Sequence, residues 1–309
     1  MKLYPRKKAR ICKSQMPNHK MENEYKMESV YGFLRFFRNL VRYCQTAPHP
    51  TEKIFIEKLR SQLALKSKVV MFGLGKSVNE HEINAQSMPQ DWYYVALSRW
   101  VHHNYIPDLI FFEIANTKGS ENFTADFMNT VNKKSQAYKN TLIVVGGLEQ
   151  SDWCDRRTEF ILNKANLDIK NNLHFIRTFP IGARSKNSLK LLLKLFFMLQ
   201  SIGLVNLMFL HSRSSIVGLI LLAVQLKVRE VCLVGFDGIS GYFAPKGSEF
   251  YGEYYAEKNL NSALHSTFDP KYGLPTTQEC ISVLKSRIRL YTNSTESILY
   301  PDLPVKFPE

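Results

Sequence analysis

The chain has 309 residues, of which 45% are hydrophobic and 12% aromatic, so it can bury a sizeable core as one large or two small domains. This composition excludes a disordered or fibrous protein. The formal charge of +14 at pH 7 indicates an anionic partner, which is a nucleic acid, an anionic membrane surface or a phosphorylated ligand.

The N-terminal part of the chain is basic. Residues 1–27 show no apolar period and no apolar core of a secretory signal, so we expect a disordered arm on a cytoplasmic protein. Residues 30–43 repeat apolar side chains at helical spacing with three arginines between them, which predicts an amphipathic basic helix. This helix either packs on its own domain or lies peripherally on the anionic inner membrane. It belongs to a helical extension over 28–66, whose second helix covers 51–65.

From residue 68 strands alternate with helices, which predicts an α/β fold with a mostly parallel sheet over 67–238. The expected helices between strands are 121–135, 155–165 and 188–201. Residues 204–238 are expected to form a compact βαβ unit with an apolar helix to residue 226, because continuous apolar runs suit strands that are buried on both faces. The expected strands are 69–72, 92–97, 109–113, 142–145, 174–178, 204–210 and 230–234.

Residues 239–275 lose all periodicity, and we expect a lid or an acceptor-binding loop there because loops of this length are usually functional. Thr276 and Glu279 form a capping-box pair, which predicts a last helix to about residue 289. A short strand at 290–292 and a tail with three prolines complete the domain over 276–309.

Two turns that follow strands are candidates for binding a phosphate. The first carries Gly73, Gly75 and Ser77, and it is not a Walker A loop because Val70 stands where that motif needs its first glycine. The second, residues 211–215, precedes an apolar helix, where backbone N–H groups and the helix dipole favour an anion. A simple tight turn and a plain helix cap are equal alternatives for these two segments.

The chain contains no Asp-x-Asp pair, which many sugar-nucleotide enzymes use to hold a divalent metal, so a metal-independent mechanism is favoured. Hydroxyls, amides and cations then have to stabilise the leaving phosphate. Tyr242 can supply such a hydroxyl and His265 a general base, although a packing tyrosine and an exposed loop histidine are the ordinary alternatives. His211, beside Ser214, is a second candidate for a site histidine.

Together these segments resemble the bacterial sialyltransferases of glycosyltransferase family 42 and, more loosely, the lipopolysaccharide-core Kdo transferases. The Gly-x-Gly-x-Ser turn of that family matches residues 73–77. Its Thr-Ser-Gly, apolar helix, strand and Gly-x-Asp signature corresponds without a gap to residues 214–237. The chain departs from the family at Leu74 and Ile216, where the family has Asn and Gly. Two further Asn positions fall at about Ser98 and Glu113.

The resemblance implies a Rossmann-like, GT-A-like domain with a lid. The enzyme would move sialic acid, another nonulosonic acid or Kdo from a CMP-sugar to a hydroxyl of a lipopolysaccharide, lipooligosaccharide or capsular glycan. Transfer would invert the anomeric centre and need no metal and no further cofactor. His265 would be the base, Tyr242 would stabilise the phosphate, and Arg213 would pair with the donor carboxylate. The implied nucleotide-binding residues are Gly73, Gly75, Ser77, Ser98, Ser214, Ser215, Asp237, Asn293 and Ser294.

Other classes of protein stay open at this stage. The charge of +14 keeps a nucleic-acid-binding protein as an alternative, although the basic residues are dispersed and no known nucleic-acid-binding motif occurs. A non-catalytic component of surface-polysaccharide assembly and an unrelated nucleotide-binding enzyme are further alternatives. The transferase is the favoured interpretation, with a CMP-sugar, a glycan acceptor and an inner-membrane surface as partners, no nucleic acid, and a homo-oligomer compatible with it.

Overall fold

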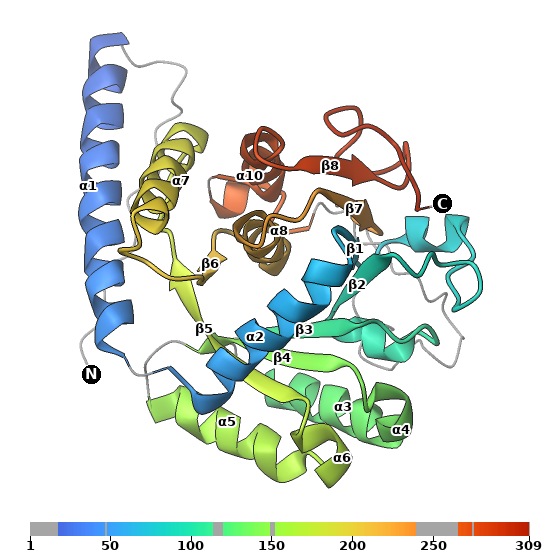
Figure 1. Cartoon of the computed structure of the whole chain (residues 1–309). Helices are drawn as coiled ribbons and strands as arrows, with labels where there is room; N and C mark the ends of the chain where they lie inside the picture. The colour runs from blue at the N-terminus through green and yellow to red at the C-terminus, as the bar shows by residue number, and fades with distance from the viewer. Residues whose placement is uncertain are drawn as a thin grey trace.

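The computed structural model describes residues 18–46, 48–113, 120–148, 152–238, 265–273 and 275–308. Eight strands form one parallel sheet in the order β6-β5-β4-β3-β2-β1-β7-β8 (Figure 1). This sheet confirms the predicted α/β class. The strands are β1 (Lys68–Phe72), β2 (Trp92–Leu97), β3 (Leu109–Glu113), β4 (Leu142–Leu148), β5 (Leu173–Pro180), β6 (Phe209–His211), β7 (Glu230–Val234) and β8 (Arg289–Thr292).

The helices follow the expected alternation with the strands. In the part of the chain that the structure describes, the short 3₁₀ turns η2 (Lys76–Glu80), η3 (Ser98–His102) and η4 (Pro270–Tyr272) follow β1, β2 and β7 in sequence. The α-helices are α1 (Asn18–Gln45), α2 (Pro50–Leu65), α3 (Ser120–Lys133), α4 (Ser135–Tyr138), α5 (Asp152–Lys164), α6 (Leu167–Lys170), α7 (Lys186–Ser201), α8 (Ser215–Gln225) and α10 (Thr277–Leu284).

Along most strands of the sheet, alternate residues pack into two separate cores, one on each face. Val69 and Met71 of β1 join the core under α1, α2, α7, α8 and α10. Val70 and Phe72 join the core that α3, η3 and α5 cover. Side chains in a strand point to opposite faces in turn, and apolar residues at every position therefore produce a sheet covered on both sides.

Two predicted helix boundaries are wrong. Helix α1 begins at Asn18, inside the segment for which a disordered arm is expected. That part has no proline or glycine, and its Glu and Lys residues are good helix formers, so the helix extends back to the residue after Pro17. Helix α10 ends at Leu284, earlier than expected, while the capping box of Thr276 and Glu279 is confirmed.

The predicted strand 204–210 is also wrong, because only Phe209–His211 pair with β5. The Gln225 amide donates to the Met208 carbonyl at 2.8 Å and accepts from the Met208 amide at 3.1 Å. The Gln225 side chain therefore hydrogen-bonds to the backbone N–H and C=O of Met208, the groups that a longer strand would use to pair with its neighbour.

The expected compact βαβ unit does not form. Strand β6 lies at one edge of the sheet, whereas β7 pairs with β1 near the opposite edge. Helix α8 makes the crossover, and its residues from Ile216 to Ala223 are all buried. A helix that is apolar all round is one that the core encloses, so α8 lies buried in the core on this face of the sheet, along the connection from β6 to β7.

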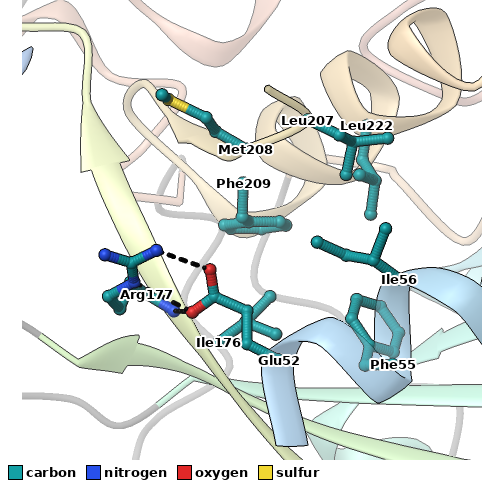
Figure 2. A pocket seen from close by; sticks show the side chains of 9 residues that line it. All are labelled: Glu52, Phe55, Ile56, Ile176, Arg177, Leu207, Met208, Phe209 and Leu222. Atoms are coloured by element: carbon teal, nitrogen blue, oxygen red, sulfur yellow. Dashed lines mark hydrogen bonds and ion pairs between the residues drawn. The ribbon is translucent and has the colours of Figure 1, made fainter. Parts of the chain in front are cut away.

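The N-terminal helices pack on the domain through a buried ion pair. Glu52 of α2 is 6% exposed and accepts from Arg177 of β5 at 2.9 Å and 3.0 Å. Figure 2 shows this pair beside a narrow apolar crevice between α2, β5 and α8. The Phe36 ring of α1 meets the Phe179 ring edge-on at 5.3 Å. One face of α1 therefore packs on its own domain, as the first of the two interpretations expects.

Among the helices that the structure describes, none combines the length and the hydropathy needed to cross a bilayer.

Candidate active site at the carboxyl edge of the sheet

The candidate site lies where the chain reverses its direction across the sheet. From β1 the strands run outward to β6, and the chain then returns to place β7 on the other side of β1. Ligands of open α/β sheets bind outside the carboxyl ends of the strands at such a switch point. All strand pairs are parallel, so the residues that follow β1, β2, β3, β6, β7 and β8 lie along one edge.

Three predicted nucleotide residues form one hydrogen-bonded group at this edge. Ser77 donates to the Asp237 carboxylate from its backbone N–H, at 2.9 Å, and also from its hydroxyl. The Asn293 amide donates to the Ser77 carbonyl at 2.9 Å and accepts from the Gly235 N–H at 3.2 Å. Ser77 is 2% and Asn293 3% exposed. This group therefore joins the ends of β1, β7 and β8, and its polar atoms form hydrogen bonds with other protein atoms.

Gly73 and Gly75 allow the turn after β1 to approach the turn after β7. Their backbone N–H groups donate to the carbonyls of Val234 and Gly235 at 2.7 and 2.8 Å. A Cβ on Gly73 would lie 2.4 Å from the Gly235 oxygen, and one on Gly75 would lie 2.3 Å from an Asp237 carboxylate oxygen. Contact between the two turns therefore requires both glycines.

Ser294 is also buried in this part of the edge. Its hydroxyl donates to Glu80 of η2 at 2.9 Å. The neighbouring Ser297 hydroxyl donates to the Phe236 carbonyl at 2.8 Å. Both residues hold the turn after β8 against the turns after β1 and β7.

A second group surrounds the start of α8. Glu113, the last residue of β3, accepts from the Ser215 hydroxyl, and its other oxygen lies 3.3 Å from Nε2 of His211. Burial acts to raise the pKa of Glu113, but the His211 and Ser215 contacts outweigh it, so the net pKa is lowered. An ionised carboxylate thus stands near the N-terminus of α8, where the helix dipole favours an anion.

Ser214 is the N-cap residue of α8, but its side chain makes no capping hydrogen bond. Its hydroxyl instead lies 3.0 Å from the hydroxyl of Thr277 on α10. Arg213 before it has φ +71°, which turns the chain sharply between β6 and α8. Backbone N–H groups of the first turn of α8 are consequently not capped by the Ser214 side chain.

Arg213 holds the segment that carries His265. Its guanidinium donates to the carbonyls of Ser266, Thr267 and Asp269. The His265 backbone N–H donates to the Gly238 carbonyl at 2.8 Å, directly after the Asp237 turn. This segment therefore bridges the ends of β6 and β7, and the Arg213 head group is engaged with backbone carbonyls.

The imidazole of His265 is exposed, and its Nδ1 lies 3.0 Å from the Thr267 hydroxyl. Partial burial and the charge of Arg213 lower the pKa of His265 from its ordinary 6.5. The ring is thus neutral at pH 7, as a proton acceptor has to be.

The structure places the predicted residues in three positions. Ser77, Asp237, Asn293 and Ser294 lie together, Arg213, Ser214 and Ser215 surround the start of α8, and His265 connects the two groups. Ser98 begins η3 at the same edge and is half-buried. Tyr242 lies outside the described residues.

Sequence reasoning gave no chemical role to Glu113 and Thr277, which contact the predicted serines. The resemblance placed Glu113 only at about a position where the family has Asn. Glu113 also ends a predicted strand, and an acidic residue at that edge was a further signal. The sequence gives no sign of the Thr277 contact, since a threonine as the first residue of a helix is ordinary. Within the described ranges, no cluster of three or more His, Cys, Asp or Glu residues has the geometry to hold a metal ion.

No protein-family model matches the chain, and no curated protein matches it either. Among solved structures it is similar to a variant of the sialyltransferase CST-II of Campylobacter jejuni with CMP, at 17% identity and a TM-score of 0.44, over 77% of this chain and 85% of that one. It is similar to CST-II with a trisaccharide acceptor and CMP, at 15% identity and a TM-score of 0.41, over 77% and 85% of the two chains. It is also similar to the monofunctional alpha-2,3-sialyltransferase Cst-I from Campylobacter jejuni, at 16% identity and a TM-score of 0.44, over 78% and 81%. All are sialyltransferases, the class of enzyme that the sequence motifs resemble.

Proposed function

We propose that this chain is a glycosyltransferase that moves an acidic sugar from a CMP-sugar to a hydroxyl of a surface glycan. The transfer inverts the anomeric centre and uses no metal. The acceptor is a lipopolysaccharide, lipooligosaccharide or capsular glycan, and the enzyme meets it at the anionic inner membrane through the exposed face of the helix over 30–43.

The observation that carries this proposal is the meeting of distant motif residues at the switch point of the sheet. Ser77, Asp237 and Asn293 come from three segments and form one hydrogen-bonded group. The start of α8 lies at the same edge, with backbone N–H groups suited to a phosphate. A nucleotide-binding edge built from these motifs is what the sequence resemblance implies.

The hydrogen-bonded group of Ser77, Asp237 and Asn293 supports the site from below, and the half-exposed residues around it contact the donor. Ser98, Ser214 and Ser215 offer hydroxyls to the nucleotide, while the first turn of α8 offers backbone amides to the phosphate. Tyr242 stabilises the departing phosphate. Arg213, which lies between β6 and α8 and is bonded to carbonyls of residues 266–269, contributes positive charge for the donor carboxylate.

His265 takes the proton of the acceptor hydroxyl. For this role the ring carries its own proton on Nδ1, which then donates to the Thr267 hydroxyl 3.0 Å away in place of accepting from the Thr267 N–H at 3.4 Å, so that the Nε2 lone pair takes the acceptor proton. The lowered pKa keeps the ring neutral and ready to accept. The hydroxyl oxygen then attacks the anomeric carbon, and CMP leaves with the electron pair of the broken bond.

A thermal-shift panel of CMP, UDP, GDP and ATP tests the nucleotide. We expect stabilisation by CMP alone, and a preference for UDP or GDP would overturn the proposal. His265→Ala should abolish transfer while the CMP shift survives. His211→Ala is the matched histidine variant, and loss of transfer in it with full activity in His265→Ala would assign the base to His211 instead.

A further inference from the structure

Helix α1 has two apolar faces, and only one of them packs on the domain. Phe36 is buried, and Phe33 and Leu40 are half-buried against the core. Leu34 and Val41 are 63% and 54% exposed. On a helix of about 3.6 residues per turn, these exposed side chains lie between the packed face and the arginines.

Helix α7 lies beside α1 and has the same arrangement (Figure 1). Leu192 and Phe196 are buried, whereas Leu191 and Met198 are exposed, Met198 to 53%. Ile202, directly after the helix, is 62% exposed. Leu191 and Met198 are neighbours of the half-buried Leu195 along the helix, so the exposed stripe borders the packed one.

These two helices concentrate the exposed apolar surface of the described ranges. Thirteen large hydrophobic side chains are exposed there, and eight of them lie on α1, on α7 or within three residues after α7. Single exposed apolar residues are ordinary, whereas a concentration of them on two helices that pack together marks a candidate interaction surface. We call this group, with the basic residues around it, the α1–α7 surface.

The charge on the α1–α7 surface has one sign. Arg35, Arg38 and Arg42 on α1 are exposed, as are Lys186, Lys190 and Lys194 on α7. Residues 30–45 and 186–204 contain no Asp or Glu. Apolar side chains next to basic ones, without acidic residues, are the composition of helices that lie in an anionic lipid interface.

We propose that the α1–α7 surface docks this protein on an anionic lipid bilayer, with both helices in the plane of the interface. Leu34, Val41, Met198 and Ile202 enter the boundary between headgroups and acyl chains. The arginines and lysines contact the lipid phosphates. A second copy of the chain is a poor occupant, since a symmetric contact would bring six positive charges against six. The same like-charge repulsion disfavours the basic residues 1–17.

This inference deepens the proposed function, because a lipid-linked acceptor is presented at such a bilayer. It does not depend on catalysis, since vesicle binding is measured without nucleotide. CMP stabilisation with no vesicle binding would overturn the docking surface, and with it the membrane contact of the proposed function, while the transferase itself would stand. Vesicle binding without a CMP response would overturn the proposed function alone.

The test is co-sedimentation of the full chain with phosphatidylcholine vesicles, with and without phosphatidylglycerol. We expect binding to the anionic vesicles only, and release at high salt. Each basic residue near an anionic surface contributes roughly fivefold to partitioning, so Arg38→Gln with Lys190→Gln and Lys194→Gln should weaken binding about a hundredfold.

The apolar pairs Leu34→Gln with Val41→Gln and Met198→Gln with Ile202→Gln should each weaken binding at least tenfold. Leu167→Gln with Lys170→Gln on α6 is the matched control and should bind normally, since both side chains are exposed on the other face of the sheet. All these surface changes leave the unfolding midpoint unaltered. Equal binding of the α1, α7 and control variants would overturn the proposal. So would loss of binding on deletion of residues 1–17 alone, or a dimer in solution that the α1 and α7 variants dissolve.

Discussion

Replacing Glu113 with Gln should increase the affinity of this protein for CMP more than for cytidine. Glu113 accepts from the Ser215 hydroxyl, and the His211 and Ser215 contacts lower the pKa of its carboxyl against the effect of burial, so the carboxylate is ionised at neutral pH. A phosphate at the start of α8 would therefore approach a negative charge. Gln keeps the shape and an acceptor oxygen but removes that charge.

The magnitude follows from the distances at the start of α8. A phosphate bound to the Ser215 hydroxyl would lie roughly 6 Å from the Glu113 carboxylate, where two unit charges repel by about 3 kcal/mol at an effective dielectric constant near 20. His211 lies 3.3 Å from the other oxygen of Glu113 and offsets most of this repulsion. We expect a net gain of about 1 kcal/mol, which is roughly a fivefold increase in CMP affinity.

Titration calorimetry with CMP and with cytidine measures this effect, because the two ligands differ only in the phosphate. Glu57→Gln on α2 is the control, since Glu57 is exposed and pairs with Lys53, away from the start of α8. An equal change for both ligands would show that Glu113 acts on the nucleoside. A weaker affinity for CMP would refute the placement of the phosphate at α8.

Other consequences concern stability. Asn293→Ala removes the partners of the buried Gly235 N–H and Ser77 carbonyl, so urea unfolding should show a loss of about 2–4 kcal/mol, against no change for the exposed Asn163→Ala. Gly75→Ala forces the turn after β1 away from Asp237 and should cost about 1–3 kcal/mol, with a smaller CMP thermal shift. Glu52→Gln leaves Arg177 without its carboxylate and should cost about 3 kcal/mol, whereas Glu52→Leu with Arg177→Met should recover most of that loss. Burial lowers the pKa of His174 from 6.5 to about 4, so at pH values between these the unfolded chain binds a proton that the folded chain does not. The free energy of unfolding should therefore decrease by about 3 kcal/mol as the pH is lowered from 6.5 to 4. His174→Leu should flatten this pH dependence, and an unchanged profile would contradict it.

Much of the fold could be predicted from local pattern. The bounds of β2, β3 and β7 agree with the apolar runs, because each run ends at a polar residue or a glycine. The position of β7 beside β1 could not be predicted, since nothing in a local run specifies the strand that it pairs with. The strand predicted over 204–210 was too long, because the Gln225 side chain hydrogen-bonds to the backbone of Met208 from 17 positions away in the sequence.

The candidate site shows the same division between local and distant information. The glycines and serines that follow strands could be found, because the carboxyl edge of a parallel sheet collects them. Their partners could not, since Ser77 and Asn293 are 216 positions apart. The Glu113 contact with His211 also depends on strand order, which the sequence alone does not reveal.

The residues of the Gly-x-Gly-x-Ser and Gly-x-Asp motifs suggest direct contact with a nucleotide, but the buried ones contribute by holding the strand ends together. Ser77 and Asn293 bond to each other and to the ends of three strands: the Asn293 amide oxygen accepts from the Gly235 N–H and the Ser77 hydroxyl, and its nitrogen donates to the Ser77 carbonyl, so this buried amide makes most of its hydrogen bonds inside the protein. Ligand contacts must then come from the half-exposed rim, where Ser98, Ser215 and Glu113 lie. Changes in the buried group should therefore affect stability and binding together, whereas changes in the rim should affect binding alone. Comparing the two effects therefore distinguishes the buried residues that support the site from the half-exposed residues that touch the ligand.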